Sequence, residues 1–161
     1  MKKLFVLIAL TMLLTSISAL ATPKIGDYAE YDMNLSRDGM SLPGSYIQEV
    51  LAFDAASNTY NVKTIFQLQG GEANIQEEAK PADDFIDDMK IDVLLGSCAD
   101  VGGTLETTQV PAGNFNTCKL LLEDSENTVW IWIAKVPFGF VKLDQTQKDG
   151  MHIILEMKNF R

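Results

Sequence analysis

The residues that could carry nucleophilic chemistry are few. The chain has one histidine, His152, and two cysteines, Cys98 and Cys118. A Ser-His-acid or Cys-His set would have to use His152 as its base. This histidine lies in an alternating apolar segment, residues 151–155, and no serine stands in a nucleophile-elbow motif. We expect a structural histidine, no catalytic residues and no enzyme, although the sequence does not decide whether two carboxylates meet across strands.

The sequence predicts no metal site and no cofactor. One histidine and two cysteines cannot build a zinc site. An acidic group between residues 83 and 92 could attract calcium, but the segment lacks the alternating pattern, central Gly and terminal Glu of a calcium loop. We expect this group to form the solvated face of a helix. Its members are Asp83, Asp84, Asp87, Asp88 and Asp92.

The two cysteines are predicted to form a disulfide. Both Cys98 and Cys118 lie in the part of the chain expected to be exported, and an even count in an oxidising compartment favours pairing. The chain-entropy contribution for a loop of this size is about 3 kcal/mol. The alternative, a reactive free thiol, would need a base nearby, and His152 is the only conventional one.

The N-terminus has the pattern of a signal peptide. Met1-Lys2-Lys3 is a short basic region, residues 4–14 are an apolar run too short to span a bilayer comfortably, and Ala19-Leu20-Ala21 supplies small residues before a cleavage point. We expect cleavage after Ala21 and a periplasmic or secreted mature chain. The alternative is an uncleaved membrane anchor. Residues 22–161 have the length of a single domain.

The charge of the chain argues against nucleic acid as a partner. The formal net charge is −9, and removal of Lys2 and Lys3 with the signal peptide takes it to −11. Such a balance repels phosphate backbones and anionic lipid headgroups. Its simplest role is solubility.

One strand is predicted to be apolar on both faces. Residues 129–136 alternate with a period of two, so two apolar sets point in opposite directions. Such a strand needs cover on both sides, which indicates a central position with a packed layer on one face and a lined hollow or a partner on the other. The two sets are Val129, Ile131 and Ile133, and Trp130, Trp132 and Ala134.

The remaining pattern predicts an α+β fold that is mostly β. Alternating segments at 28–36, 46–53, 60–69, 105–110, 115–123, 141–147 and 151–160, with a charged edge strand at 74–80, give about eight or nine strands. One amphipathic helix is expected from Pro81 to Gly96. Its apolar face would be Phe85, Ile86, Met89, Val93 and Leu94. A sheet of this size curls into an incomplete barrel, on which the helix packs.

The last third of the chain resembles a known group of proteins. The quoted residues are VPAGNF at 110–115, Thr117-Cys118, Val129-Trp130, VPFG at 136–139 and Val141-Lys142. Their order resembles the small periplasmic proteins related to the lipoprotein-carrier LolA and LppX-like group. The resemblance implies an incomplete antiparallel barrel with helices and a hydrophobic cavity that accepts acyl chains in the carriers. This chain offers less helical lid than those carriers.

Two functions are consistent with these patterns. The first is non-catalytic binding of an apolar ligand, a lipid or lipoprotein acyl chain, in the mouth of the curved sheet. Its expected lining is Trp130, Trp132, Phe66, Phe85 and Met89, unless these residues fill a closed core. The second is a structural or protein-interaction module of the cell envelope, whose partner binds the sheet edge or the corner at 137–139. An exposed Phe138 and a weak ligand pocket would favour it.

Overall fold

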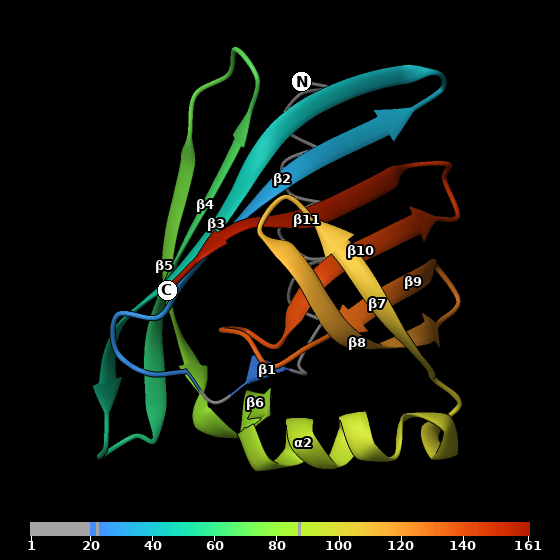
Figure 1. Cartoon of the computed structure of the whole chain (residues 1–161). Helices are drawn as coiled ribbons and strands as arrows, with labels where there is room; N and C mark the ends of the chain where they lie inside the picture. The colour runs from blue at the N-terminus through green and yellow to red at the C-terminus, as the bar shows by residue number, and fades with distance from the viewer. Residues whose placement is uncertain (1–19, 22, 87) are drawn as a thin grey trace.

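The computed structural model describes residues 20–21, 23–86 and 88–161, which form a curved, open antiparallel sheet of nine strands with one α-helix (Figure 1). The order across the sheet is β5-β4-β3-β2-β11-β10-β9-β8-β7. These strands are β2 (Tyr28–Arg37), β3 (Met40–Asp54), β4 (Thr59–Leu68), β5 (Asn74–Pro81), β7 (Thr104–Val110), β8 (Gly113–Glu123), β9 (Asn127–Ile133), β10 (Phe140–Gln147) and β11 (His152–Phe160). The predicted fold class is confirmed.

The short elements connect β5 to β7. A 3-10 turn, η1 (Ala82–Asp84), leads into β6 (Phe85–Ile86), which pairs in parallel with β1 (Leu20–Ala21). The α-helix α2 (Asp88–Gly96) and a second 3-10 turn, η2 (Cys98–Val101), follow. Within the described ranges, no helix is long and apolar enough to cross a membrane. The predicted signal peptide, apart from its last two residues, and Asp87 of the acidic group lie outside the described residues.

The helix differs from its prediction. The segment predicted to start it contributes Phe85 to β6, so α2 begins only at Asp88. Ile91 is then the residue that is fully buried, while Met89 and Val93, expected on the packed face, are 74% and 64% exposed. The pairing of β6 with β1 replaces the first turn of the expected helix. The remaining helix packs through Ile91, which was not predicted, and through Leu94, which belongs to the predicted face.

The first hairpin is also tighter than predicted. The predicted segments 28–36 and 46–53 left a long connection between them, but Arg37 pairs directly with Met40, which leaves a two-residue turn. Asp38 and Gly39 have φ of 52° and 78°, the backbone that a type I′ turn requires. Gly44 lies inside β3, where an added Cβ would clash with Gln67 O and Met33 Cε, so this glycine permits a close strand approach rather than a turn.

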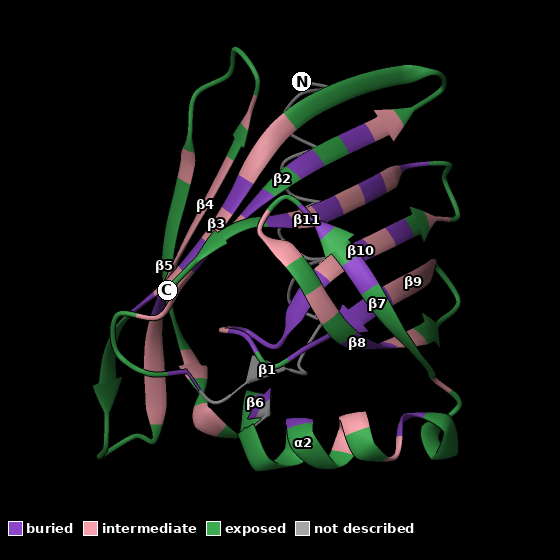
Figure 2. Cartoon of the chain, viewed as in Figure 1, coloured by how far each residue is buried: buried purple, intermediate pink, exposed green. Residues whose placement is uncertain are grey.

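The outer strands of the sheet are β5 and β7. The prediction of a charged edge strand at 74–80 is confirmed by β5, whose Glu77 and Glu78 are exposed and whose Lys80 pairs with Glu78 at 2.9 Å. Charges of this kind discourage pairing with another chain. Buried and exposed positions alternate along the central strands, most regularly in β2 and β11 (Figure 2).

Candidate ligand-binding face

One face of the sheet carries a continuous aliphatic row. Paired residues in neighbouring antiparallel strands point to the same side, so the register shows which side chains share a face. Following the pairs from β8 through β9, β10, β11, β2 and β3 to β4 gives Leu120, Ile131, Leu143, Leu155, Met33, Gly44 and Leu68. We call the side of the sheet that carries this row the aliphatic face. The middle of the row is buried: Leu143 is 0% and Leu155 1% exposed.

Aromatic residues flank this row on the same face. Tyr31 is fully buried, stacks on Phe140 with ring centroids 4.7 Å apart, and donates a hydrogen bond from its hydroxyl to Phe140 O at 3.1 Å. Tyr31 pairs with Tyr46 of β3, which in turn pairs with Phe66 of β4. Desolvation of the buried phenol raises the pKa of Tyr31 well above its usual value. The Tyr31 side chain therefore stays neutral. It packs beside the aliphatic row.

A small polar group lies on the aliphatic face beside these aromatics. Gln48 pairs with Thr64, and both lie next to the Tyr46–Phe66 pair. Burial and then the negative charge of Glu78 raise the pKa of Tyr46, while hydrogen bonding from Thr64 and Gln48 opposes the shift. The face is thus aliphatic at its centre and polar toward β5.

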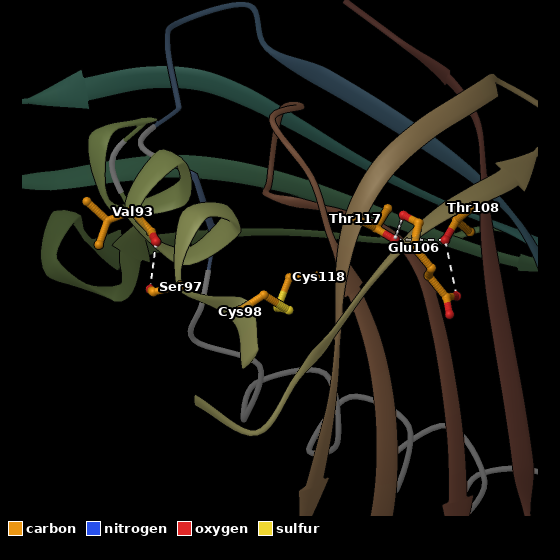
Figure 3. The surroundings of a disulfide bond; sticks show 7 residues. All are labelled: Val93, Ser97, Cys98, Glu106, Thr108, Thr117 and Cys118. Atoms are coloured by element: carbon orange, nitrogen blue, oxygen red, sulfur yellow. Dashed lines mark hydrogen bonds between the residues drawn. A yellow bond between two sulfur atoms is a disulfide. The ribbon is translucent and has the colours of Figure 1, made fainter. Parts of the chain in front are cut away.

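The helix α2 is fastened to the aliphatic side by the disulfide. Cys98 follows α2 directly, and its bridge to Cys118 of β8 has a Cα–Cα distance of 5.7 Å (Figure 3). Cys118 pairs with Ile133, so the bridge approaches the sheet on the aliphatic face. Both cysteines are buried, and the predicted disulfide is confirmed. At the end of the helix, Ser97 Oγ donates to Val93 O at 2.7 Å.

The opposite side, which we call the tryptophan face, is closed by groups of the chain itself. Trp132 is 7% exposed, and its indole Nε1 donates to Glu106 Oε1 of β7 at 2.6 Å. Lys119 Nζ lies 4.8 Å from the Trp132 ring centroid and Lys142 Nζ 5.4 Å. Cation–π contacts of this length hold the ring between two ammonium groups.

The tip of the β7–β8 hairpin reaches across to β11. Ala112 N donates to Met157 O at 2.9 Å, and the Phe115 and Phe160 rings meet edge to face at 5.8 Å. Within the hairpin, Thr108 and Thr117 share a hydrogen bond of 2.8 Å, and Thr117 also donates to Glu106 O (Figure 3). Both threonines are buried on the Trp132 side of the sheet, whereas Leu121, which pairs with Trp130 on the same side, is 40% exposed.

The five residues predicted to line a hollow are not brought together. By register, Trp132 shares a side with Lys142, Glu156, Asp32 and Ser45, whereas Phe66 faces the other way with Tyr46. Their placements are: Trp130 half-buried and Trp132 buried on the tryptophan face, Phe66 half-buried on the aliphatic face, Phe85 buried in β6, and Met89 exposed on α2. Ligand contact by these residues remains a prediction.

Sequence reasoning did not single out the polar group around Gln48. A signal for it was present, because residues 46–53 alternate and Gln48 stands between Tyr46 and Val50 at a position where an apolar residue belongs. A glutamine on the packed side of a strand indicates a buried polar group that needs partners.

Other features of the described residues give weaker support for a functional site. His152 Nε2 lies 2.7 Å from Asp144 Oδ1, and Ser36 stands opposite His152 in register, but among the described residues no hydrogen bond joins Ser36 to the ring. A shallow cleft of about 330 Å³ is lined by residues 43–45 and 67–70 and contains none of the predicted site residues. No cluster of three or more potential metal ligands occurs in the part of the chain that the structure describes.

Comparisons with known proteins bear on the fold alone. No protein-family model and no curated protein matches the chain. A solved structure of a protein described as exported, with a YmcC-like fold, from Bacteroides fragilis is similar at 12% identity with a TM-score of 0.51, over 88% of this chain and 98% of that one. At this identity the likeness shows a shared fold.

Two further solved structures are similar at lower scores. MucB in complex with MucA has 8% identity and a TM-score of 0.44, over 84% of this chain and 50% of that one. An outer membrane lipoprotein-sorting protein domain from Vibrio parahaemolyticus has 8% identity and a TM-score of 0.37, over 86% of each chain. A lipoprotein-sorting domain, the kind of protein that the sequence resembles, is thus among the structural matches, while the fold likeness itself rests on the Bacteroides fragilis protein.

Proposed function

We propose that this chain is an exported, non-catalytic protein that binds the apolar part of a lipid or of a lipoprotein acyl chain on the aliphatic face of its sheet. The observation that carries the proposal is the aliphatic row across seven strands, set against the small amount of helix available to cover it. The sequence resemblance to lipoprotein carriers favours the same ligand class.

The sizes of the row and of α2 differ by a factor of two. Seven strands at a spacing of about 4.8 Å extend over about 29 Å. A helix of nine residues is about 14 Å long.

The disulfide holds the C-terminal end of α2 near β8. The N-terminal end of α2 follows β6, where the Phe85 ring meets Tyr60 of β4 edge to face at 5.3 Å, so one short helix runs between the two ends of the row (Figure 1). The middle of the row is buried, whereas its end residues Leu120 and Leu68 are half-buried. An acyl chain laid along the face would add apolar contact with both ends.

The sequence predicts cleavage after Ala21. Ligand binding is therefore proposed for the mature, periplasmic or secreted form.

The interaction-module alternative loses one of its predicted supports. It called for an exposed aromatic at the corner 137–139, but Phe138 is fully buried. We retain an envelope protein partner only as the source of a lipidated segment, not as a partner for that corner.

The test is the composition of the protein purified from the compartment to which it is exported. Native mass spectrometry and lipid extraction of the mature chain should recover an acyl lipid in near-stoichiometric amount. Trp130→Ala, which changes the opposite face, is the control and should carry the same lipid. A mature chain that is free of lipid and also takes up no apolar dye in vitro would overturn the proposal.

A further inference from the structure

Gln48 is the most unusual polar side chain on the aliphatic face. It is 3% exposed, and its side-chain Oε1 has no hydrogen-bond partner among the described residues. It lies on β3 between Tyr46 and Val50, and it pairs with Ala29 on one side and Thr64 on the other. A buried acceptor without a partner is costly enough that native proteins rarely leave one unexplained.

Gln145 shows how such a side chain is normally accommodated. It lies on the same face in β10, since it pairs with Val129 and Ile153, and it is 2% exposed. Its Nε2 donates to Asn127 Oδ1 at 3.0 Å, and its side chain has no unpartnered buried atom. Of these two glutamines of similar burial on one face, only Gln48 has a fully buried side-chain acceptor without a partner among the described residues.

The groups around Gln48 restrict what could meet this acceptor. A carbonyl oxygen accepts and cannot donate, so the incoming group must bring an O–H or N–H. Glu78 acts on Tyr46 with its negative charge, and Lys80 on the same strand is paired with Glu78 at 2.9 Å. A second carboxylate placed here would meet the like charge of Glu78 and lose its hydration, and it has no hydrogen to donate to Gln48 Oε1.

We propose that Gln48 selects the polar end of the bound lipid. The ligand class is a neutral acyl amphiphile whose head carries a hydrogen-bond donor, such as an alcohol or an amide, in preference to a fatty acid anion or an acceptor-only ester. This inference rests on the proposed function, because it places the acyl chain along the aliphatic row and the head beside Tyr46 and Thr64.

The experiment is displacement of Nile red from the mature chain by four ligands that share one chain length: hexadecanol, hexadecanamide, methyl hexadecanoate and hexadecanoate. It is done at about pH 8, where a carboxylate is ionised. The alcohol and the amide should displace the dye at about five- to tenfold lower concentration than the methyl ester, which corresponds to one net hydrogen bond. Hexadecanoate should be weakest.

Two variants separate Gln48 from the rest of the face. Gln48→Met keeps the size of the side chain and removes the acceptor, so the alcohol and the ester should become equal. Gln145→Met is the matched control and should retain the wild-type preference. The two variants should be similarly resistant to denaturant, because Gln48→Met removes a hydrogen bond to Tyr46 and Gln145→Met removes the one to Asn127.

The outcomes are distinguishable. Equal displacement by all four ligands, or a preference that survives Gln48→Met, overturns the role of Gln48 and leaves the proposed function standing. A Gln48→Met chain that is clearly less stable than Gln145→Met shows that the acceptor is partnered and also overturns it. A wild-type chain that binds neither the dye nor any of the ligands overturns both proposals.

Discussion

The two faces of β9 are covered in different ways. On one side Trp132 is enclosed by Lys119 and Lys142 from the neighbouring strands β8 and β10, and by Glu106 from β7. On the other side Ile131 belongs to a row that continues through four more strands beyond β10, with one nine-residue helix anchored at its β8 end. Both faces are apolar in sequence, so composition does not distinguish them. The difference lies in what the rest of the chain supplies as cover.

This contrast indicates where a ligand belongs. An indole that finds a carboxylate for its N–H and two cations for its ring is a satisfied packing element. The aliphatic row exceeds its helix by about 15 Å, from the dimensions of strands and helices. Its middle is buried, but its end residues Leu120 and Leu68 are only half-buried. We therefore assign structural packing to the tryptophan face and ligand binding to the aliphatic face, and each prediction below tests one part of that assignment.

The largest effect is expected on the closed face. Trp132→Ala should reduce the free energy of unfolding by about 3–5 kcal/mol, because it deletes a buried aromatic side chain together with its hydrogen bond. Trp130→Ala should cost less, since Trp130 is half-buried. Urea denaturation of the two variants gives the comparison. Equal losses of unfolding free energy in the two variants would mean that Glu106 and the β7–β8 hairpin do not bury Trp132 more than Trp130.

The disulfide ranks next. Cys98→Ser and Cys118→Ser should each lower the free energy of unfolding by a similar amount, about 3 kcal/mol, because either removes the same crosslink over a separation of 20 residues. Denaturant midpoints with and without reductant provide the measurement. Alkylation of both thiols in unreduced, denatured protein would contradict the bridge.

A smaller loss is expected at Gly103. A Cβ there would lie 2.6 Å from Cys98 Sγ and 2.8 Å from Cys118 Sγ, in a crowded region below the helix exit. Gly103→Ala should therefore destabilise the chain by about 1–3 kcal/mol, the usual range for overpacking. Gly96→Ala is the control, because a Cβ at Gly96 meets nothing within 4 Å. Thermal unfolding of the two variants measures the difference in stability. A Gly103→Ala chain as stable as Gly96→Ala would show that a Cβ at residue 103 can be accommodated beside the disulfide.

The smallest effect at neutral pH is expected for Tyr31→Phe, which loses one hydrogen bond to Phe140 O and about 1 kcal/mol. At high pH the variant becomes informative. Burial holds the folded-state pKa of Tyr31 above the unfolded value of about 10, so its stabilising contribution is complete below about pH 10 and falls as pH rises toward the folded-state pKa.

The pH dependence gives the measurement. Wild-type stability should fall above about pH 10 by about 1.4 kcal/mol per pH unit for each such tyrosine. The Tyr31→Phe chain should fall less steeply by that amount in urea titrations. Parallel curves for the two chains would show that Tyr31 ionises normally and that its surroundings are wet.

Much of the fold could be predicted from local pattern. The alternation at 28–36 and 151–160 corresponds to β2 and β11, the charged segment at 74–80 corresponds to the edge strand β5, and the two cysteines form the expected bridge. The strands could be predicted because alternation is a property of residues adjacent in sequence. The disulfide could be predicted because the chain has only two cysteines.

The candidate site could be predicted only in part, because it depends on register between distant strands. A period of two shows that Trp132 and Ile131 face opposite ways, but it does not show that Phe66 shares its face with Ile131 and not with Trp132. The helix was misplaced for a similar reason. Phe85 fits a helical spacing, and only its long-range pairing with Leu20 places it in a strand.

The most direct test is dye binding by four single variants in β9 of the mature chain: Ile131→Ala, Ile133→Ala, Trp130→Ala and Trp132→Ala. Affinity for Nile red is measured under conditions where each variant is folded. The assignment predicts that the two isoleucine variants bind about tenfold more weakly, since each loses apolar contact area, while the two tryptophan variants keep wild-type affinity. Weakened binding in the tryptophan variants alone, or no binding by the wild-type chain, would contradict the aliphatic face as the ligand site.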